Sequence, residues 1–122
     1  MDGLEESCRR LLGPARKQAD LLRDVRELVL DDIGKEPPRL GAVAKALKLS
    51  PKSLERRLRF RRTSFSRIVD DIRRDLSSQW LRDTDMTLDQ VAFLAGYAAT
   101  AAWLRAFKRW TGTTPKRFRE LR

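Results

Sequence analysis

The chain has 122 residues, of which 27 are Lys or Arg and 17 are Asp or Glu, for a net charge of +10. It contains one cysteine and no histidine. Without histidine the chain lacks the commonest general base, the Ser-His triad and most zinc sites, so we expect no enzyme, no metal site and no cofactor. A single cysteine excludes an internal disulfide, and we expect Cys8 to be a small, part-buried apolar residue.

The positive charge is confined to the later part of the chain. Residues 1–36 hold seven basic and nine acidic side chains, whereas residues 37–122 hold 20 basic and eight acidic ones, a net charge of +12. This asymmetry favours a polyanionic partner for residues 37–122, the alternative being an ordinary solvated surface. The longest candidate membrane segment, Val91 to Leu104, has 14 residues, fewer than the ~20 that a bilayer needs. No signal peptide is evident, so we expect a cytoplasmic protein and no membrane partner.

Residues 1–36 are predicted to form a helical segment that precedes the basic region. A weak apolar stripe of Leu4, Cys8, Leu11 and Leu12 ends at Gly13-Pro14. A stronger stripe, which predicts a helix ending before Gly34, consists of Leu21, Leu22, Val25, Leu28, Val29 and Ile33. Pro37-Pro38 then predicts an extended link.

The most informative stretch runs from residue 86 to residue 112. Thr87 and Gln90 have the spacing of a capping box, and Gly96 stands where a helix must turn through positive φ. After this turn the inward stripe is Trp103, Phe107 and Trp110, and the opposite face carries Ala101, Leu104, Arg105 and Lys108. These features predict a helix-turn-helix unit over about residues 87–110 that presents its second helix to DNA. A helical hairpin in any all-α core would share the inward stripe.

An internal repeat favours the DNA-binding interpretation. Leu40, Val43 and Ala44 recur 48 residues later as Leu88, Val91 and Ala92, and Leu54, Arg56 and Leu58 recur 49 residues later as Trp103, Arg105 and Phe107. A second helix-turn-helix unit is therefore predicted over about residues 40–60. Ser50-Pro51 marks the start of its second helix, with Ser as N-cap and Pro at the first helical position.

A long amphipathic helix over about residues 64–82 is predicted to bridge the two units. Its apolar face consists of Phe65, Ile68, Val69, Ile72, Leu76 and Trp80. We expect Ile72 and Leu76 to be buried between the two lobes. Thr114-Pro115 predicts a last short helix with Phe118 and Leu121 facing inward. No strand pattern is found, so the expected fold class is all-α.

With these residues in hand, the chain resembles the DNA-binding domain of the AraC/XylS family of bacterial transcription regulators. The resemblance covers about residues 37–121. The matching residues are Val43-Ala44, Leu49-Ser50, Leu54, Arg56, Leu58, Ser64-Phe65, Arg73, the junction from Leu81 to Leu88, Val91-Ala92, Gly96-Tyr97, the run Arg105 to Trp110, Gly112 and Pro115. It implies about seven helices, arranged as two three-helix lobes on a bridging helix, with two recognition helices in successive major-groove segments of double-stranded DNA. Residues 1–36 resemble the linker before this domain in longer members, whose effector-sensing domain is absent here.

The resemblance also implies which side chains meet DNA. The base-contact candidates are Lys52, Glu55 and Arg56 in the first unit and Thr100, Ala101, Leu104 and Arg105 in the second. Arg can donate to guanine and Glu can accept from cytosine, although Glu55 could equally pair with Arg59 one turn away. The phosphate-contact candidates are Arg57, Arg59, Arg61, Arg62, Lys108, Arg109 and Lys116.

Two departures from the family pattern affect these expectations. The family usually has glycine at the positions of Lys48 and Arg62, so each turn is expected to cost up to ~1 kcal/mol if positive φ is kept. The start of the second recognition helix is usually polar, whereas here residues 98–102 read AATAA. Alanine can touch a thymine methyl group but cannot hydrogen-bond a base. We therefore expect the second unit to read less sequence than the first.

The sequence thus predicts the sequence-specific DNA-binding domain of a transcription regulator. RNA polymerase is a candidate second partner. We expect activation, although the sequence does not distinguish it from repression. The alternatives are a basic protein that binds nucleic acid without sequence preference and a helical module that binds a protein partner.

Overall fold

The computed structural model describes residues 20–122, which form seven helices and no strand. The leading helix covers residues 20–32, and the others are α2 (Leu40–Ala46), α3 (Pro51–Phe60), α4 (Phe65–Asp83), α5 (Leu88–Leu94), α6 (Thr100–Thr111) and α7 (Pro115–Glu120). The prediction of an all-α fold with about seven helices is confirmed. The weak stripe predicted in residues 1–12, including Cys8, lies outside the described residues.

Four of the helices begin at a capping side chain of the expected type. Ser50, Ser64 and Thr114 each accept a hydrogen bond from the backbone N–H three residues later, at 3.1, 3.2 and 3.2 Å. Thr87 does the same for the Gln90 amide, and the Gln90 side chain accepts from the Thr87 N–H at 2.9 Å. The predicted capping box and both Ser/Thr-Pro starts are therefore confirmed, and each cap satisfies a backbone N–H that the helix itself leaves unpaired.

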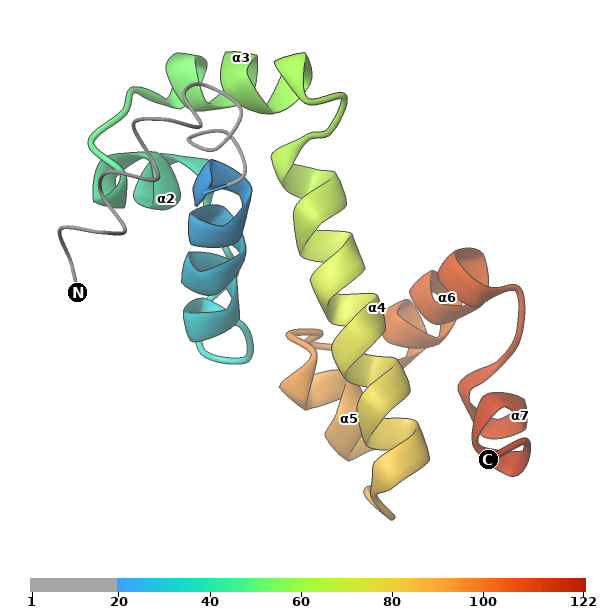
Figure 1. Cartoon of the computed structure of the whole chain (residues 1–122). Helices are drawn as coiled ribbons and strands as arrows, with labels where there is room; N and C mark the ends of the chain where they lie inside the picture. The colour runs from blue at the N-terminus through green and yellow to red at the C-terminus, as the bar shows by residue number, and fades with distance from the viewer. Residues whose placement is uncertain (1–19) are drawn as a thin grey trace, which may run out of the picture.

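The other helices lie in two groups along α4 (Figure 1), and each group encloses a separate apolar core. The first is built from the leading helix, α2, α3 and the first half of α4: Val25, Val29, Val43, Ala44, Leu54, Leu58, Ile68, Val69 and Ile72. The second is built from the end of α4 together with α5 and α6: Leu81, Val91, Ala92, Ala95, Trp103 and Phe107. The bridging helix thus supplies a side of each core, as its long apolar face predicts.

Three side-chain placements differ from the expectation for this arrangement. Ile72 is buried, but inside the first core, and Leu76 is only partly buried against that same core, so neither is buried between the lobes. Leu121 is 74% exposed rather than inward-facing. It directly follows the last residue of α7, and Phe118 is the side chain of this helix that packs against the second core.

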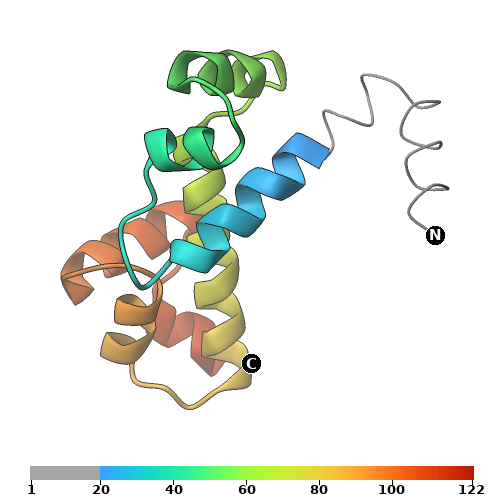
Figure 2. The same cartoon turned by 90° about the vertical axis from the view of Figure 1, so that its left-hand side faces the viewer.

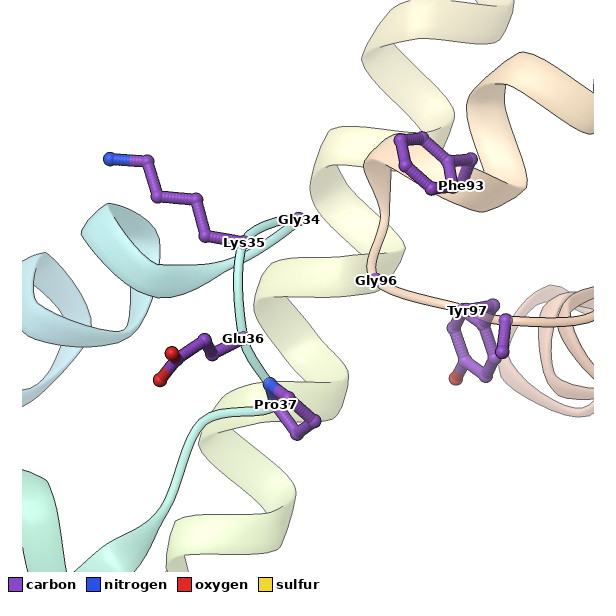
Figure 3. A pocket seen from close by; sticks show the side chains of 8 residues that line it. Gly34, Lys35, Glu36, Pro37, Phe93, Gly96 and Tyr97 are labelled. Carbon is purple, nitrogen blue, oxygen red and sulfur yellow. The ribbon is translucent and has the colours of Figure 1, made fainter.

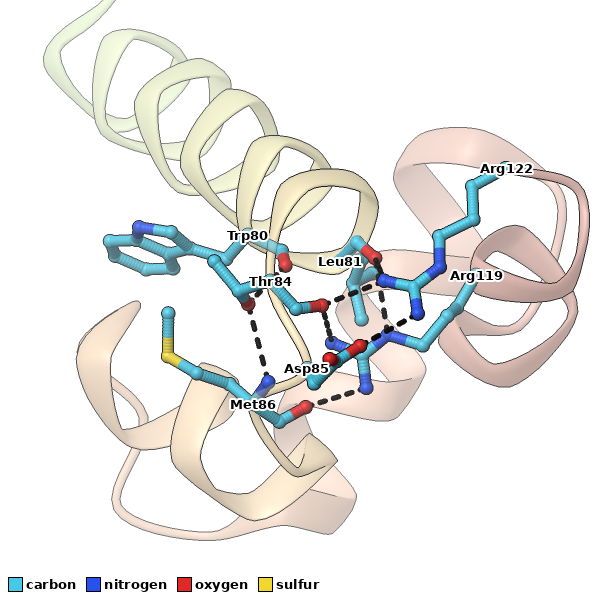
Figure 4. A network of polar contacts seen from close by, with 7 residues as sticks. All are labelled: Trp80, Leu81, Thr84, Asp85, Met86, Arg119 and Arg122. Atoms are coloured by element: carbon cyan, nitrogen blue, oxygen red, sulfur yellow. Dashed lines mark hydrogen bonds and ion pairs between the residues drawn. The ribbon is translucent and has the colours of Figure 1, made fainter.

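Two arginines tie the end of the chain to the α4–α5 junction (Figure 4). Arg119 donates hydrogen bonds to the carbonyl oxygens of Leu81, Thr84 and Met86. Arg122 donates to the Leu81 and Thr84 carbonyls and to the Asp85 carboxylate. These carbonyls belong to the last turn of α4 and to the segment after it, where intrahelical partners run out. The two guanidinium groups therefore fix the angle between α4 and α5.

The leading helix extends the first lobe toward the second. Arg26 lies 3.9 Å from Asp75 of α4, and Val25 and Val29 are fully buried in the first core. In the view of Figure 2 this helix runs diagonally across α4 and ends close to α5. There a side chain at Gly34 would meet the Leu94 carbonyl oxygen at 3.1 Å. The segment after the leading helix thus packs directly on the second lobe.

Candidate nucleic-acid interface

The helices α3 and α6 occupy equivalent places in the two copies of the repeat. Each packs on the preceding helix of its unit, α2 or α5, through a pair of side chains four residues apart. Leu54 and Leu58 form this pair in α3 and Trp103 and Phe107 form it in α6, and all four are fully buried. The opposite face of each helix is therefore directed to solvent. Arg56 and Arg105 lie at matching positions on these two outer faces, and both are exposed.

The outer face of α3 is strongly basic. Lys52, Glu55 and Arg56 are exposed, as are Arg57 and Arg59. The structure contains no ion pair between Glu55 and Arg59, although both line a shallow cavity of about 340 Å³ at the end of α3. The carboxylate of Glu55 is thus free to accept a hydrogen bond from a partner. The pairing of Glu55 with Arg59 is therefore not formed in this structure, and the base-facing role of Glu55 stays a prediction.

The outer face of α6 is less polar. Ala101, Leu104 and Arg105 are exposed, and Lys108 and Arg109 follow in the last turn. Thr100 is only partly exposed, and its hydroxyl donates a 2.7 Å hydrogen bond to the carboxylate of Asp89 on α5. The second face therefore offers one arginine and a group of apolar side chains where the first face offers three charged groups.

The remaining phosphate-contact candidates are distributed unevenly. Arg62 and Lys116 are exposed, at the end of α3 and in the first turn of α7. Arg61 is partly buried, and its Nε atom is enclosed, so this side chain does not project with the others. The arginines at 57, 59 and 62 surround the end of α3, whereas Lys108 and Arg109 form a second basic group at the end of α6.

Left-handed residues close the first helix of both units. Lys48 has φ +60° and Gly96 has φ +96°, and these positions correspond in the repeat. The following amides close the same loop in each unit: Leu49 N–H donates to the Ala44 carbonyl at 2.8 Å, and Tyr97 N–H donates to the Ala92 carbonyl at 3.0 Å. Arg62, also at φ +60°, lies just after the end of α3, and Gly112, at φ +79°, lies just after the end of α6. Lys48 and Arg62 therefore have the positive φ that is expected at these positions, although neither residue is glycine.

A pocket between the two lobes lies beside the turn that leads into α6 (Figure 3). It has a volume of about 170 Å³ and is lined by residues 34–37 of the first lobe and by Phe93, Gly96, Tyr97 and Ala98. Behind it the guanidinium of Arg73 on α4 lies 5.0 Å from the centre of the Tyr97 ring. A side chain at Gly96 would meet this guanidinium at 3.4 Å. Arg73 and the 34–37 segment together support the turn before α6.

Several residues that position the interface are not evident from periodicity. Ser77 is fully buried, and its hydroxyl oxygen accepts a 3.0 Å hydrogen bond from the indole N–H of Trp103. Asp89 accepts a hydrogen bond from Thr100, and Arg119 donates to a backbone carbonyl at the α4–α5 junction. Of these residues, Ser77 could have been found from the sequence, because it is a polar residue among the apolar residues of α4, between Ile72 and Leu81.

Two ionisable groups near these contacts have shifted pKa values. Burial raises the pKa of the Tyr97 phenol above its ordinary value of 10.0, and the positive charge of Arg73 partly opposes this shift. The pKa of the exposed Asp85 carboxyl is lowered, first by its hydrogen bond from Arg122 and then by the charge of that guanidinium.

The two-lobed geometry agrees with comparisons to known proteins. Residues 43–121 match a protein family described as "Helix-turn-helix domain". The Ornithine utilization regulator of Pseudomonas aeruginosa is 36% identical over 116 residues, which cover 95% of this chain and 34% of the regulator. The chain belongs to the AraC/XylS family. The HTH-type transcriptional regulator VqsM of the same organism is 34% identical over 98 residues, which cover 80% of this chain and 30% of VqsM.

Solved structures share the AraC-type fold. A DNA-binding transcriptional dual regulator from Escherichia coli K-12 superimposes with a TM-score of 0.77 and 25% identity, covering 82% of this chain and 89% of that structure. The DNA-binding domain of AdpA, solved in complex with a target DNA, superimposes with a TM-score of 0.70 and 22% identity, covering 82% of this chain and 90% of that structure. At this identity the second similarity shows the fold alone.

These findings confirm the predicted family, the predicted fold and the expectation of a DNA-binding regulator rather than an enzyme. The chain spans about a third of the length of the curated AraC-type relatives that it matches. Within residues 20–122, no helix is long and apolar enough to cross a membrane.

Proposed function

We propose that this chain binds double-stranded DNA sequence-specifically by placing α3 and α6 in successive segments of the major groove. The observation that carries the proposal is the pair of outward faces at equivalent positions of the repeat, each with one exposed arginine opposite two fully buried side chains. An α-helix fits the major groove, and residues on its exposed face reach the base edges.

The bridging helix has a suitable length for this arrangement. Its 19 residues correspond to about 28 Å at the rise of an α-helix, somewhat less than one turn of B-DNA at about 34 Å. Because α3 stands near its beginning and α6 packs beyond its middle, one chain can present two recognition helices without a twofold partner (Figure 1).

Within this proposal the two units have unequal roles. Lys52, Glu55 and Arg56 of α3 can donate to guanine and accept from cytosine, so the first unit supplies most of the hydrogen-bonded base recognition. In the second unit Arg105 is the one long polar side chain of the base-contact set, beside Thr100, Ala101 and Leu104. The phosphate contacts come from Arg57, Arg59, Arg62, Lys108, Arg109 and Lys116, which flank the two faces and set the register. The sequence predicts Arg61 to be one of these contacts, but it is left out of the proposal because it is partly buried.

The test compares two alanine variants on a duplex selected from a random pool and on a scrambled duplex in the same buffer. Arg56→Ala should weaken binding to the selected duplex by about 1–3 kcal/mol and relax preference at one or two base pairs. Arg105→Ala should weaken binding more evenly across sequences. Arg23→Ala is the matched control, because it removes one exposed charge from the leading helix, away from both faces.

Two results would contradict parts of this proposal. A larger loss of specificity for Arg105→Ala than for Arg56→Ala would reverse the ranking of the units. Equal losses for Arg56→Ala and Arg23→Ala on every duplex would favour the alternative function, a basic protein that binds nucleic acid without sequence preference, since only net charge would then matter.

The remaining parts of the proposal concern the whole protein. A relative 31% identical over 80 residues is named Transcriptional activator PerA, which supports activation and, with it, RNA polymerase as a second partner. Because the longer relatives extend well beyond the matched region, residues 1–36 are proposed to be the helical linker to an effector-sensing domain and residues 37–122 the DNA-binding domain. A regulator of this kind acts in the cytoplasm, on the nucleoid.

A further inference from the structure

We infer that α6 reads the 5-methyl groups of thymine, and that Asp89 is the positioning residue that makes this possible. The inference rests on the proposed function, because it names the base chemistry that the second recognition helix selects. It starts from the hydrogen bond between Thr100 and Asp89 and from the absence of other polar side chains in the first turn of α6.

The first turn of α6 offers DNA no free side-chain hydrogen-bond donor. The residues at 98, 99, 101 and 102 are alanines, three of them exposed, and the N-cap Ala99 makes no side-chain hydrogen bond. Thr100 is the one residue there with a polar side chain. Its hydroxyl donates a 2.7 Å hydrogen bond to the carboxylate of Asp89, an exposed residue of α5. Leu104, 37% exposed, continues the apolar surface one turn later.

Asp89 also fixes where the methyl group of Thr100 lies. The hydroxyl and the methyl of threonine are attached to the same carbon, so holding the oxygen sets the single side-chain torsion and with it the position of the methyl. Asp89 is itself fixed in the first turn of α5, between Thr87 and Gln90 of the capping box. The carboxylate therefore converts a side chain that could form hydrogen bonds with bases into an apolar contact with a set direction.

A surface of this kind discriminates among bases in two ways. In the major groove only thymine carries a C5-methyl group, whereas cytosine has a hydrogen at C5 beside its N4 donor, and guanine and adenine present N7 with O6 or N6. Contact with thymine buries methyl against methyl. Contact with another base would remove water from a polar edge and supply no partner, which is unfavourable. The half-site under α6 is thus expected to be thymine-rich, with Arg105 available for a neighbouring guanine.

The experiment replaces each thymine of a selected duplex in turn by deoxyuridine, which removes only the 5-methyl group. The half-site under α6 is first located as the base pairs whose protection is lost in the Arg105→Ala variant. Deoxyuridine there should lower affinity about fourfold per contacted methyl, the factor that corresponds to burying one methylene group. Deoxyuridine in the half-site under α3 is the internal control and should change affinity less than twofold.

A matched pair of variants then separates methyl from hydroxyl recognition. Thr100→Ser keeps the hydroxyl and loses the methyl, so it should bind the thymine duplex about fourfold more weakly and lose its sensitivity to deoxyuridine at one position. Thr100→Val keeps the methyls and loses the hydroxyl, so its affinity should stay within about twofold. Asp89→Ala should reduce the preference for thymine over cytosine, because Thr100 can then rotate its hydroxyl toward the base. Thermal melts of all three check that α6 remains folded.

The failures of this inference and of the proposed function are distinguishable. If the chain prefers its selected duplex but deoxyuridine has no effect under α6, or if Thr100→Val loses affinity while Thr100→Ser does not, the methyl inference is overturned and the function stands. If selection yields no preferred duplex at all, both are overturned.

Discussion

At the scale of single residues, the interface depends on buried side chains that never meet DNA. The hydrogen bond from Trp103 to Ser77 joins the middle of α6 to α4 inside the protein. It satisfies the one polar atom of a large buried ring and fixes the rotation of α6 about its own axis. The outward direction of Arg105 follows from this rotation, because the two residues share a helix.

Ser77→Ala should therefore destabilise the chain. The change leaves the buried indole N–H of Trp103 without a partner, which should lower the free energy of unfolding by about 1–3 kcal/mol. Ser66→Ala, at an exposed position of the same helix, is the control and should stay within about 0.5 kcal/mol of the parent. Urea unfolding followed by tryptophan fluorescence measures both. Equal stability of the two variants would show that the Ser77 contact contributes nothing.

Tyr97 gives a pH prediction at the same scale. The phenol has a raised pKa because burial disfavours its charged form, so folding holds it neutral. Its contribution to stability is then complete below the ordinary pKa of 10.0 and is lost as the pH rises through the higher folded value. Because the chain has a single tyrosine, the ultraviolet absorbance of phenolate reports this group alone. The midpoint should lie above 10.0 in the folded chain and return to 10.0 in denaturant. A folded midpoint at or below 10.0 would contradict the burial of Tyr97.

At the scale of helices, the ends are the parts that the sequence specifies best. The caps at Ser50, Thr87 and Thr114 could be predicted because a short polar side chain followed by proline, or by glutamine three residues later, has few other uses at those positions. The inward stripes of α3, α4 and α6 could be predicted from the helical period. The hydrogen bonds of Arg119 and Thr100 could not be predicted from the sequence. Their partners Leu81 and Asp89 lie 38 and 11 residues away along the chain, and no periodicity connects such pairs.

The left-handed residue that follows α2 can be tested with two glycine substitutions that should change the stability in opposite directions. Lys48→Gly removes the strain of a side chain at φ +60° but gives the unfolded chain more freedom, so stability should be unchanged or rise by up to ~1 kcal/mol. Lys45→Gly, three residues earlier inside α2, should instead cost about 0.5–1 kcal/mol, because the helix interior gains nothing from glycine. Thermal melts of the two variants measure both changes in stability. If Lys48→Gly is as destabilising as Lys45→Gly, the positive φ at residue 48 is wrong.

The bridging helix permits a comparison of two apolar positions one turn apart. Ile72→Ala should cost roughly 2–5 kcal/mol, since Ile72 is 2% exposed in the first core. Leu76→Ala should cost about half as much, because that side chain is only partly buried. Denaturant melts that ranked Leu76 above Ile72 would favour the arrangement expected from the sequence, in which Leu76 is buried between the lobes.

At the scale of the whole molecule, two apolar cores on one bridging helix hold the two outward faces of α3 and α6 in one chain. The leading helix adds to the first core and its following segment supports the turn before α6, so the second recognition helix is held from both lobes. The family, the repeat and the positive charge of residues 37–122 could all be recognised in the sequence. The way in which residues 34–37 and Arg73 meet at Gly96 could not, because it depends on how the lobes pack.

The central claim, sequence-specific binding through two basic helices, is tested most directly by one titration series. A selected and a scrambled duplex of equal length are titrated with the chain at several salt concentrations. If about six phosphates are neutralised, the logarithm of the binding constant should fall with the logarithm of salt concentration with a slope near −5. The selected duplex should bind at least about 10³-fold more tightly at every concentration. Equal affinity for the two duplexes, or a slope shallower than about −2, would contradict the account.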